Sequence, residues 1–431
     1  MKTYDAIVVG AGPAGVTAAL TMAQRGLRVL LLERGTVPGD KNMFGGMLPY
    51  CPFVEKLLPR FWQEAPFERH VVKRTLSLLS DGSASSFVFE SKNFDAPPFS
   101  GYTLYRPIFD RWYAQKAQEA GADLFNLCLV DELLIDGKSI VGVKIGHNGA
   151  EIKAPVTIVC DGVLSRLAQK AGLRKPPGPH ALALGIKASF RLKEEEINAR
   201  FGLVRDQGCS HEFIGCTQGI RGGGFIYTQM HSVSTGLVLH LDSLKKSGIA
   251  PYDLFEQFLA YDPVRKLMKG ARLVEYSAHL IPEGGYREVP QLSADGMLLA
   301  GDAAGFCYTN GLNLEGMNLA MASGFHAAET VVDAFRTRDF SAKQLAQYQR
   351  RLRDSFVLRD MKTYERSMDF MRRDRLFSVY PKLVSTIMEN IFKADGKPRD
   401  SIGRIAWKAA KDAVPLSDLL IDLWKGGRSL L

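Results

Sequence analysis

Three glycines near the N-terminus have the spacing of a dinucleotide-binding fingerprint. Gly10, Gly12 and Gly15 form a GxGxxG, with Pro13 and Ala14 between them, directly after an apolar run and at the start of a helical pattern. The first glycine allows a tight turn, the second lets a pyrophosphate approach the backbone, and the third lets the helix pack on the strand. Because the helix N-terminus offers unpaired N–H groups to phosphate, this segment predicts a bound dinucleotide.

An acidic residue follows at the distance expected for ribose recognition. Glu33 ends the second apolar run, 18 residues beyond Gly15. A carboxylate at this place accepts hydrogen bonds from the adenosine ribose hydroxyls and repels a 2′-phosphate, which disfavours NADP. We include the neighbouring Arg34 among the candidate cofactor contacts.

A second segment with small residues has the features of a flavin site. A strand pattern ends at Gly301 and Asp302, and this carboxylate suits the ribityl hydroxyls of FAD. A long helix is predicted over 313–335. Its start near Leu312 would direct the positive helix end at the flavin edge that becomes anionic on reduction. The structural alternative is an ordinary strand–turn–helix with a capping aspartate. The candidate contacts around the helix start are Gly311, Leu312 and Asn313.

Further candidates are open to a structural interpretation. Arg106, before a predicted helix at 109–120, would either reach a cofactor phosphate or make a salt bridge. Asp161 and Gly162 follow a buried-strand pattern and resemble a loop that closes over the adenosine side in flavoproteins, or they form a simple turn. Tyr227, His240 and His279, all in strand patterns, are compatible with a structural role or with proton donation. No acid–base pair stands out, so the catalytic residues are unknown.

The elements that must position these residues fall into three groups. Buried-strand and helix patterns predict a Rossmann-like FAD-binding α/β domain, assembled from residues 1–70, 105–180 and 290–340. Strand-rich segments interrupt it and predict an interleaved antiparallel-sheet substrate domain, made of residues 71–104 and 181–289. The remaining residues, 341–431, are expected to form a helical C-terminal region.

The charge of the chain is concentrated in that last region. The 431 residues carry a formal net charge of +9, and the 46% hydrophobic and 23% charged residues are typical of a globular protein. Residues 341–431 contain 19 Lys and Arg against 11 Asp and Glu. Amphipathic patterns at 402–413 and 416–424 predict docking to a partner or a membrane. We expect the arginine clusters at 350–353 and 372–375 to be solvated helix faces. No recognition fold accompanies the charge, so nucleic acid is disfavoured.

The cysteines and the apolar runs bear on the compartment. The six cysteines are scattered, with no metal-ligand spacing, which suits a reducing environment and predicts no metal site. We find no signal-peptide pattern after Met1 and no apolar run of the roughly 18–20 residues needed to span a bilayer. We therefore expect a cytoplasmic location, peripheral on the inner face of the cytoplasmic membrane.

These motifs, in this order, resemble the flavoprotein family that includes para-hydroxybenzoate hydroxylase, geranylgeranyl reductases and electron-transfer flavoprotein:quinone oxidoreductase. The sequences GGGFIY at 222–227, LIPEGGYREVPQL at 280–292 and KNMFGGMLPY at 41–50 narrow the resemblance to the quinone oxidoreductases. Within them the chain resembles FixC, also called EtfC, the flavoprotein subunit of the Fix electron-bifurcating complex. The resemblance implies that Gly45 and Gly46 lie on the flavin side, and that electrons pass from an electron-transfer flavoprotein to a membrane quinone.

One departure from the longer relatives bears on the partners. Those proteins hold a [4Fe–4S] cluster on four C-terminal cysteines, whereas no cysteine follows Cys307 here. The resemblance to FixC implies that a separate ferredoxin-like, FixX-like subunit supplies clusters. It also implies FixA/FixB-like electron-transfer flavoprotein subunits, and menaquinone or ubiquinone as acceptor.

Three other functions fit the same scaffold. An isoprenoid reductase of the geranylgeranyl reductase type would show a YxWxFP-like strand, where this chain has GGGFIYTQ. A flavin monooxygenase or halogenase reacts with O₂, and a hydroxylase also meets NAD(P)H, but no second GxGxxG is visible. A non-catalytic FAD-binding assembly subunit is the third alternative. Oxygen reactivity and quinone reduction distinguish these classes.

Overall fold

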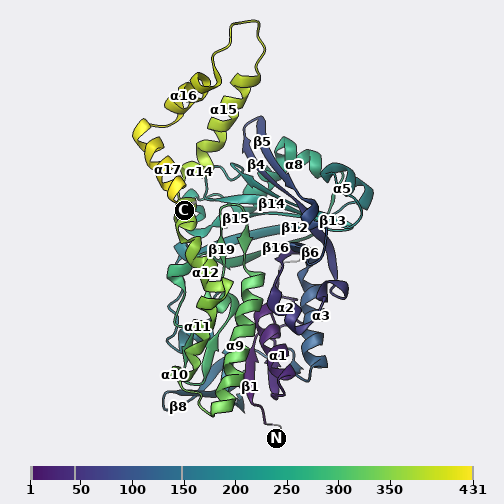
Figure 1. Ribbon diagram of the computed structural model, residues 1–431, viewed down its shortest axis with the longest axis vertical. Coiled ribbons are helices and arrows are strands. Elements are labelled where there is room, and N and C mark those ends of the chain that lie inside the picture. The colour runs from purple at the N-terminus through teal and green to yellow at the C-terminus, as the bar shows by residue number, and fades with distance from the viewer. Residues whose placement is uncertain (1–2, 43–44, 147–148, 430–431) are drawn as a thin grey trace.

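A six-stranded sheet carries the N-terminal fingerprint at one end of the molecule (Figure 1). The computed structural model describes residues 3–42, 45–146 and 149–429, so Met43 and Phe44 of the motif at 41–50 lie outside it. The strand order is β17-β18-β11-β1-β2-β7, and all neighbours are parallel except β17 and β18. The strands are β1 (Ala6–Val9), β2 (Val29–Leu32), β7 (Asp123–Phe125), β11 (Val156–Val159), β17 (Ser293–Ala294) and β18 (Met297–Leu299).

Both faces of this sheet are covered, which explains its continuous apolar strands. Helices α1 and α9 pack closely on each other, and an ideal Cβ added to Gly324 would lie 2.1 Å from the carbonyl oxygen of Ala14. A three-stranded meander packs against β11. The helices are α1 (Pro13–Gln24), α2 (Pro52–Leu57), α3 (Arg106–Glu119), α4 (Arg166–Lys170) and α9 (Met317–Thr337). The meander strands are β8 (Val130–Asp136), β9 (Ser139–Ile145) and β10 (Ala150–Lys153).

A nine-stranded sheet lies beside this domain, in the order β16-β12-β15-β14-β13-β4-β6-β3, with β5 on β4. Its pairs are antiparallel except β13 and β4. The first group of strands is β3 (Gly45–Pro49), β4 (Phe67–Ser80), β5 (Ser83–Glu90) and β6 (Gly101–Tyr105). The second is β12 (Leu182–Arg191), β13 (Gln207–Ile214), β14 (Gly222–Thr228), β15 (Ser232–His240) and β16 (Arg272–Pro282). Strand β3 belongs to this sheet although its residues fall in the range 1–70 predicted for the FAD-binding domain; the domain boundaries stay a prediction.

The two faces of the large sheet have different chemistry. One face carries Ile186, Phe213 and Leu237, which form a second buried core with Phe255 and Phe258 of α7. The opposite face carries Lys187, Phe225 and other residues in register with them. The helices on the apolar side are α5 (Glu194–Phe201), α6 (Leu241–Ser247), α7 (Pro251–Ala260) and α8 (Asp262–Leu267).

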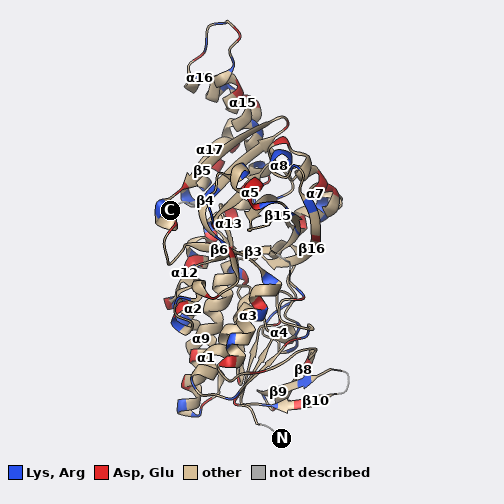
Figure 2. Cartoon of the chain, turned by 90° about the vertical axis from the view of Figure 1, so that its right-hand side faces the viewer, with Lys and Arg blue, Asp and Glu red and all other residues tan. Residues whose placement is uncertain are grey.

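The C-terminal region is helical, as predicted. Its last three helices, α15 to α17 (residues 380–429), form an arm beyond the large sheet, at the opposite end from the meander (Figure 2). The helices are α10 (Ala342–Leu345), α11 (Gln347–Asp354), α12 (Phe356–Thr363), α13 (Glu365–Met371), α14 (Arg375–Ser378), α15 (Tyr380–Phe392), α16 (Ile402–Ala413) and α17 (Leu416–Ser429). Within the described ranges, no helix has the length and apolar character to cross a membrane.

The prediction of solvated arginine clusters is wrong for part of this region. Arg373 and Arg375 pair with Asp422, a buried residue of α17, and Arg351 pairs with Asp333 of α9. The cluster residues therefore join elements that are far apart in the sequence. Spacing along one helix carries no information about such a partner.

The predicted long helix at 313–335 is also shifted. It begins at Met317, because Leu314–Glu315 (β20) pairs with Tyr308–Thr309 (β19) in a short hairpin. The helix predicted at 109–120 begins three residues earlier, at Arg106, and ends at Glu119. The described residues also form short 3-10 turns, which are η1 (Phe61–Gln63), η2 (Lys92–Phe94), η3 (Pro179–Ala181), η4 (Tyr286–Glu288) and η5 (Gly301–Ala304).

Candidate cofactor and substrate site

The β1–α1 turn has the geometry of a nucleotide cradle. Gly10 has φ +100°, and an added Cβ would lie 2.4 Å from the Cys160 carbonyl oxygen; one on Gly15 would lie 1.9 Å from the Gly10 oxygen. The fold itself therefore requires these two glycines. At Gly12, the N-cap of α1, no heavy atom lies within 4 Å of an added Cβ. The residues present thus fit FAD, because the space beside Gly12 is open at the helix N-terminus, where a pyrophosphate would bind.

The Glu33 carboxylate fixes the end of β2 against this turn. Its Oε2 accepts a hydrogen bond from the Ala11 N–H at 2.9 Å, and its Oε1 accepts one from the Gly35 N–H at 2.7 Å. The side chain is buried, whereas the neighbouring Arg34 is exposed. The carboxylate therefore lies directly at the fingerprint turn, which is the position required for ribose recognition.

The second predicted segment meets the first one in space. Gly301 has φ +64°, and an added Cβ would lie 2.9 Å from Ala14 Cβ. Its N–H donates to Ser323 Oγ of α9 at 2.9 Å. Burial raises the pKa of the adjacent Asp302, against the opposing effects of His279, Arg106 and Arg174. Asp302 is thus within electrostatic reach of Arg106 and Arg174, and it follows Gly301, which lies against Ala14 of α1.

Arg106 makes the salt bridge that was one of its two predicted roles. Its Nε and Nη2 donate to the two Asp110 oxygens at 2.9 and 2.8 Å, and Asn42 Nδ2 donates to the same carboxylate at 2.9 Å. An added Cβ on Gly46 would lie 3.7 Å from Arg106 Cγ. The guanidinium is therefore held in one orientation beside the predicted flavin-side loop. Contact with a cofactor phosphate stays a prediction.

Asp161 and Gly162 form a local turn next to the fingerprint. Asp161 accepts hydrogen bonds from Ser165 Oγ at 2.6 Å and from the Leu167 N–H at 3.2 Å, and Gly162 has φ +87°. The Asp161 Cα would lie 3.6 Å from a Cβ added to Gly10. The pair is close to the nucleotide turn, but both carboxylate oxygens serve the start of α4.

The three candidates before α9 lie in one turn and differ in their contacts within the protein. Leu312 is 59% exposed, and the Asn310 side chain accepts hydrogen bonds from the N–H groups of Leu312 and Asn313 at 2.9 and 2.8 Å. Gly311 lies in the same turn with φ +91°. Asn313 differs, because its Oδ1 accepts a hydrogen bond from Arg74 Nη1 of β4 at 3.0 Å. Only Asn313 of the three is tied to the large sheet.

The sequence analysis missed several polar residues around Gly45. A Cβ added to Gly45 would lie 2.0 Å from Ser234 Oγ and 3.3 Å from Gln229 Nε2. Both side chains are fully buried, and these two atoms have no hydrogen-bond partner among the described residues. Lys187 Nζ donates to the Gly45 carbonyl oxygen. In the sequence, only the position of Lys187 within the apolar strand sequence LALGIKASF could have indicated this polar group.

The strand residues considered for proton donation have distinct surroundings. His240 Nε2 lies 3.2 Å from Glu283 Oε2, and both side chains are buried. Tyr227 stacks on Phe225 with ring centroids 4.9 Å apart. Burial lowers the pKa of His279, with Asp302 opposing the effect. His279 is thus the one of the three whose charge is coupled to the predicted cofactor residues.

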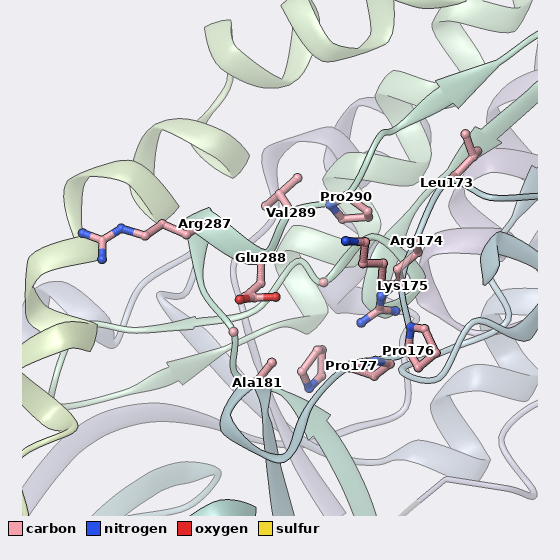
Figure 3. Close-up of a pocket in the computed structure, with 13 residues that line it drawn as sticks. Leu173, Arg174, Lys175, Pro176, Pro177, Ala181, Arg287, Glu288, Val289 and Pro290 are labelled. Carbon is pink, nitrogen blue, oxygen red and sulfur yellow. The ribbon is translucent and has the colours of Figure 1, made fainter.

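A pocket of about 270 Å³ lies between the segment 173–177 and the residues around η4 (Figure 3). Gly305, the residue after η5, also lines it. Arg174, which lines it, donates from Nη1 to the carbonyl oxygens of Asp302 and Ala303 at 3.3 and 3.1 Å. Glu288 and Lys175 also line the pocket. Arg174 therefore binds two carbonyl groups of η5.

The fold and the site together define an FAD-dependent oxidoreductase. The matching family models are described as FAD dependent oxidoreductase over residues 5–175, ETF-QO, ubiquinone-binding over 182–281, and ETF-QO/FixC family C-terminal domain over 368–431. The chain is 41% identical to the probable electron transfer flavoprotein-quinone oxidoreductase YdiS of Escherichia coli K12, covering 99% of each chain. It is 42% identical to protein FixC of Azorhizobium caulinodans, covering 92% of each. The chain belongs to the ETF-QO/FixC family.

Solved structures confirm the fold class. A geranylgeranyl bacteriochlorophyll reductase-like protein from Thermoplasma acidophilum superposes with a TM-score of 0.72 at 20% identity, covering 96% of this chain and 98% of that one. The myxobacterial halogenase CndH gives 0.67 at 17% identity, with the same coverage. The predicted resemblance to FixC, the FAD cofactor and the oxidoreductase class are confirmed by the family assignment. The individual contacts with FAD stay a prediction.

Proposed function

We propose that this chain is the flavoprotein subunit of an electron-bifurcating complex, and that it passes electrons from an electron-transfer flavoprotein to a membrane quinone. FAD, when bound, supplies the electron-transfer chemistry. The chain's task is to bind FAD, exclude water and hold the quinone. Gly12 and the α1 N-terminus would bind the pyrophosphate, Glu33 the ribose and Asp302 the ribityl chain.

The observation that carries the quinone assignment is a pair of donors beside Gly45 that have no hydrogen-bond partner within the described part of the chain. Ser234 Oγ and Gln229 Nε2 are fully buried, and leaving such groups unpaired costs free energy unless a ligand satisfies them. Both residues lie inside the segment that the ubiquinone-binding family model matches. A quinone offers two carbonyl oxygens, which accept hydrogen bonds from a hydroxyl and an amide.

The family and the C-terminal arm support the proposed partners. Relatives named FixC support FixA/FixB-like electron-transfer flavoprotein subunits and a FixX-like ferredoxin subunit as partners. The arm presents exposed apolar side chains amid the excess of positive charge in residues 341–431. We assign it first to an acidic ferredoxin-like subunit, and second to the inner face of the cytoplasmic membrane. The exposed apolar residues of the arm are Met388, Phe392, Ile402, Trp407, Leu416, Leu420, Ile421, Leu423 and Trp424.

The substitutions Gln229→Leu and Ser234→Ala test the quinone site. Each removes one donor with little change of volume, so FAD content is expected to stay at one per chain. The KM for a short-chain quinone analogue is expected to rise about three- to tenfold, because a neutral hydrogen bond contributes on the order of 1 kcal/mol. An unchanged KM in both variants would contradict the assignment. Loss of FAD with normal quinone kinetics in the residual holoenzyme would also contradict it.

A further inference from the structure

Lys187 is a buried basic residue for which the proposed function has assigned no role. It lies in the middle of β12, in register with Gly236 of β15 and Ser277 of β16, and is 8% exposed. Its Nζ donates to the Gly45 carbonyl oxygen and lies 5.5 Å from the centroid of the Phe225 ring. Among the residues that the structure describes, it forms no ion pair. Burying an ammonium without a carboxylate partner is costly, so this position calls for an explanation.

The charged groups around Lys187 come from two elements. Arg106 of α3 disfavours the ammonium, while Glu275 of β16 favours it. Glu275 is itself partly buried, and burial raises its pKa against the effect of Lys187. His279, also on β16, is coupled to Lys187, Arg106, Arg34 and Asp302. Burial, then Arg106, lower the pKa of Lys187 to about 7, with Glu275 opposing. A small change in local charge is therefore enough to change its protonation state.

The contact of Lys187 places it at the predicted flavin-side loop. The carbonyl that it binds belongs to Gly45, the neighbour of Gly46, which lies against Arg106. Ser234 Oγ and Gln229 Nε2, which no described residue binds, lie at the same glycine. The side chain thus ends where the redox ring lies if the proposed function is correct.

We propose that Lys187 is a proton-holding residue of the redox site, whose amine takes up a proton when electrons enter the FAD and releases it when they leave. This inference rests on the proposed function, since it needs FAD beside Gly45. The proton comes from solvent and binds the Nζ lone pair, and the same N–H bond breaks when the flavin is reoxidised by the quinone. The flavin's two electrons come from the electron-transfer flavoprotein. An ammonium at this position would stabilise the reduced cofactor by its charge.

The test is the midpoint potential of the bound FAD as a function of pH, compared between wild type and Lys187→Met. Below pH about 7 the wild-type lysine is charged in both redox states. The midpoint potential of FAD in the wild type is therefore expected to be higher than that in Lys187→Met. Above that pH, wild type takes up one extra proton per reduction. The equilibrium constant for reduction of its FAD then falls an extra tenfold per pH unit. For a two-electron couple this lowers the midpoint potential by about 30 mV more per pH unit. The gap between the two proteins is therefore expected to narrow as the pH rises.

Two further variants keep the result interpretable. Lys187→Arg stays charged at every pH, so its gap from Lys187→Met is expected to stay constant. Lys73→Met is the matched control, because Lys73 of β4 donates to the Phe201 carbonyl at 2.7 Å toward the α5 side of the same sheet. This control is expected to follow the wild-type curve.

Two outcomes would overturn the inference. One is a pH-independent gap between wild type and Lys187→Met, and the other is no gap. If Lys187→Met fails to hold FAD, Lys187→Arg is compared directly with wild type. Parallel curves for those two proteins would then overturn it. Failure of the proposed function is distinct, because it would show as a wild-type chain without FAD or without quinone reduction.

Discussion

The guanidinium of Arg74 and the side-chain oxygen of Asn313 join the two parts of the molecule. Arg74 Nη1 in β4 lies 3.0 Å from Asn313 Oδ1, in the turn between β19 and β20 that precedes α9. The large sheet thereby fixes the segment that leads into the helix beside the fingerprint. Residues far apart in the sequence thus position one edge of the candidate site.

We expect Arg74→Met to loosen this turn and to weaken FAD binding about three- to tenfold. The lost hydrogen bond involves a charged donor, and such bonds contribute about 1.5–3 kcal/mol, part of which solvent replaces at this half-buried site. The measurement is the dissociation constant of FAD by fluorescence. Asn313→Ala is expected to have a similar effect, and the double variant to be little worse than either single one. Fully additive effects would show that the contact does not couple the two residues.

The glycines of the fingerprint are predicted to fail in different ways. Gly12→Val adds atoms where the protein has none within 4 Å, so the fold is expected to persist while FAD is lost. Gly15→Ala places a Cβ 1.9 Å from the Gly10 oxygen, so the apoprotein itself is expected to lose thermal stability. Absorbance at flavin wavelengths and thermal unfolding distinguish the two. A Gly12→Val protein with one FAD per chain would refute the fingerprint assignment.

Asp422 is predicted to attach α17 to the body of the protein in a pH-dependent way. Burial would raise its pKa, but hydrogen bonds from Arg375 and Tyr380 and the charges of both arginines, Arg375 and Arg373, lower it to about 2. In the unfolded chain an aspartate titrates near 4. Its stabilisation is therefore complete above pH about 4, and is lost as the pH falls through about 2.

Asp422→Asn is expected to raise amide exchange throughout α17 at neutral pH, by roughly tenfold or more, since it weakens charge-assisted hydrogen bonds. Asp412→Asn is the control, because Asp412 is an exposed residue of the neighbouring α16. Unchanged exchange in α17 would mean that other contacts hold the helix. Arg375→Met should reproduce the Asp422→Asn result.

The exposed apolar side chains of α17 are predicted to retain a partner subunit. Leu420→Glu with Leu423→Glu places two charges where the side chains are 66% and 64% exposed, so the fold and the FAD content should not change. Co-purification of the iron-containing subunit is expected to fall at least tenfold. In the wild type it should also weaken at high salt, because charge contributes to docking. Val204→Glu, at an apolar residue 62% exposed on the body, is the control. Undiminished co-purification would exclude α17 from the interface.

The sequence predicted the features that depend on residues close together in the chain better than those that depend on distant residues. The fingerprint is local, so Gly10, Gly12, Gly15 and Glu33 were found together with the strands and the helix that hold them. The helix after residue 313 was misplaced, because a hairpin of two-residue strands competes with helix propensity there. Leu312 therefore lies in the turn before β20 and not at a helix start, and its contact with FAD stays a prediction.

The polar groups around Gly45 lie beyond sequence reasoning for a different reason. They converge only through strand register, which brings Lys187 opposite Gly236 and Ser234 opposite Tyr227. The pairing of Asp422 with Arg375 likewise spans 47 positions of the chain. A pattern of residue types predicts which face of a strand is buried, but not which distant residue will meet it.

The most direct test of the central claim is NADH-driven reduction of a menaquinone or ubiquinone analogue by this chain together with its co-purified partners. We predict one FAD on this chain, iron only on the small partner, and quinone reduction that stops when Gly12→Val replaces the wild-type chain. Fully loaded, partner-bound protein that reduces no quinone analogue from NADH would contradict it.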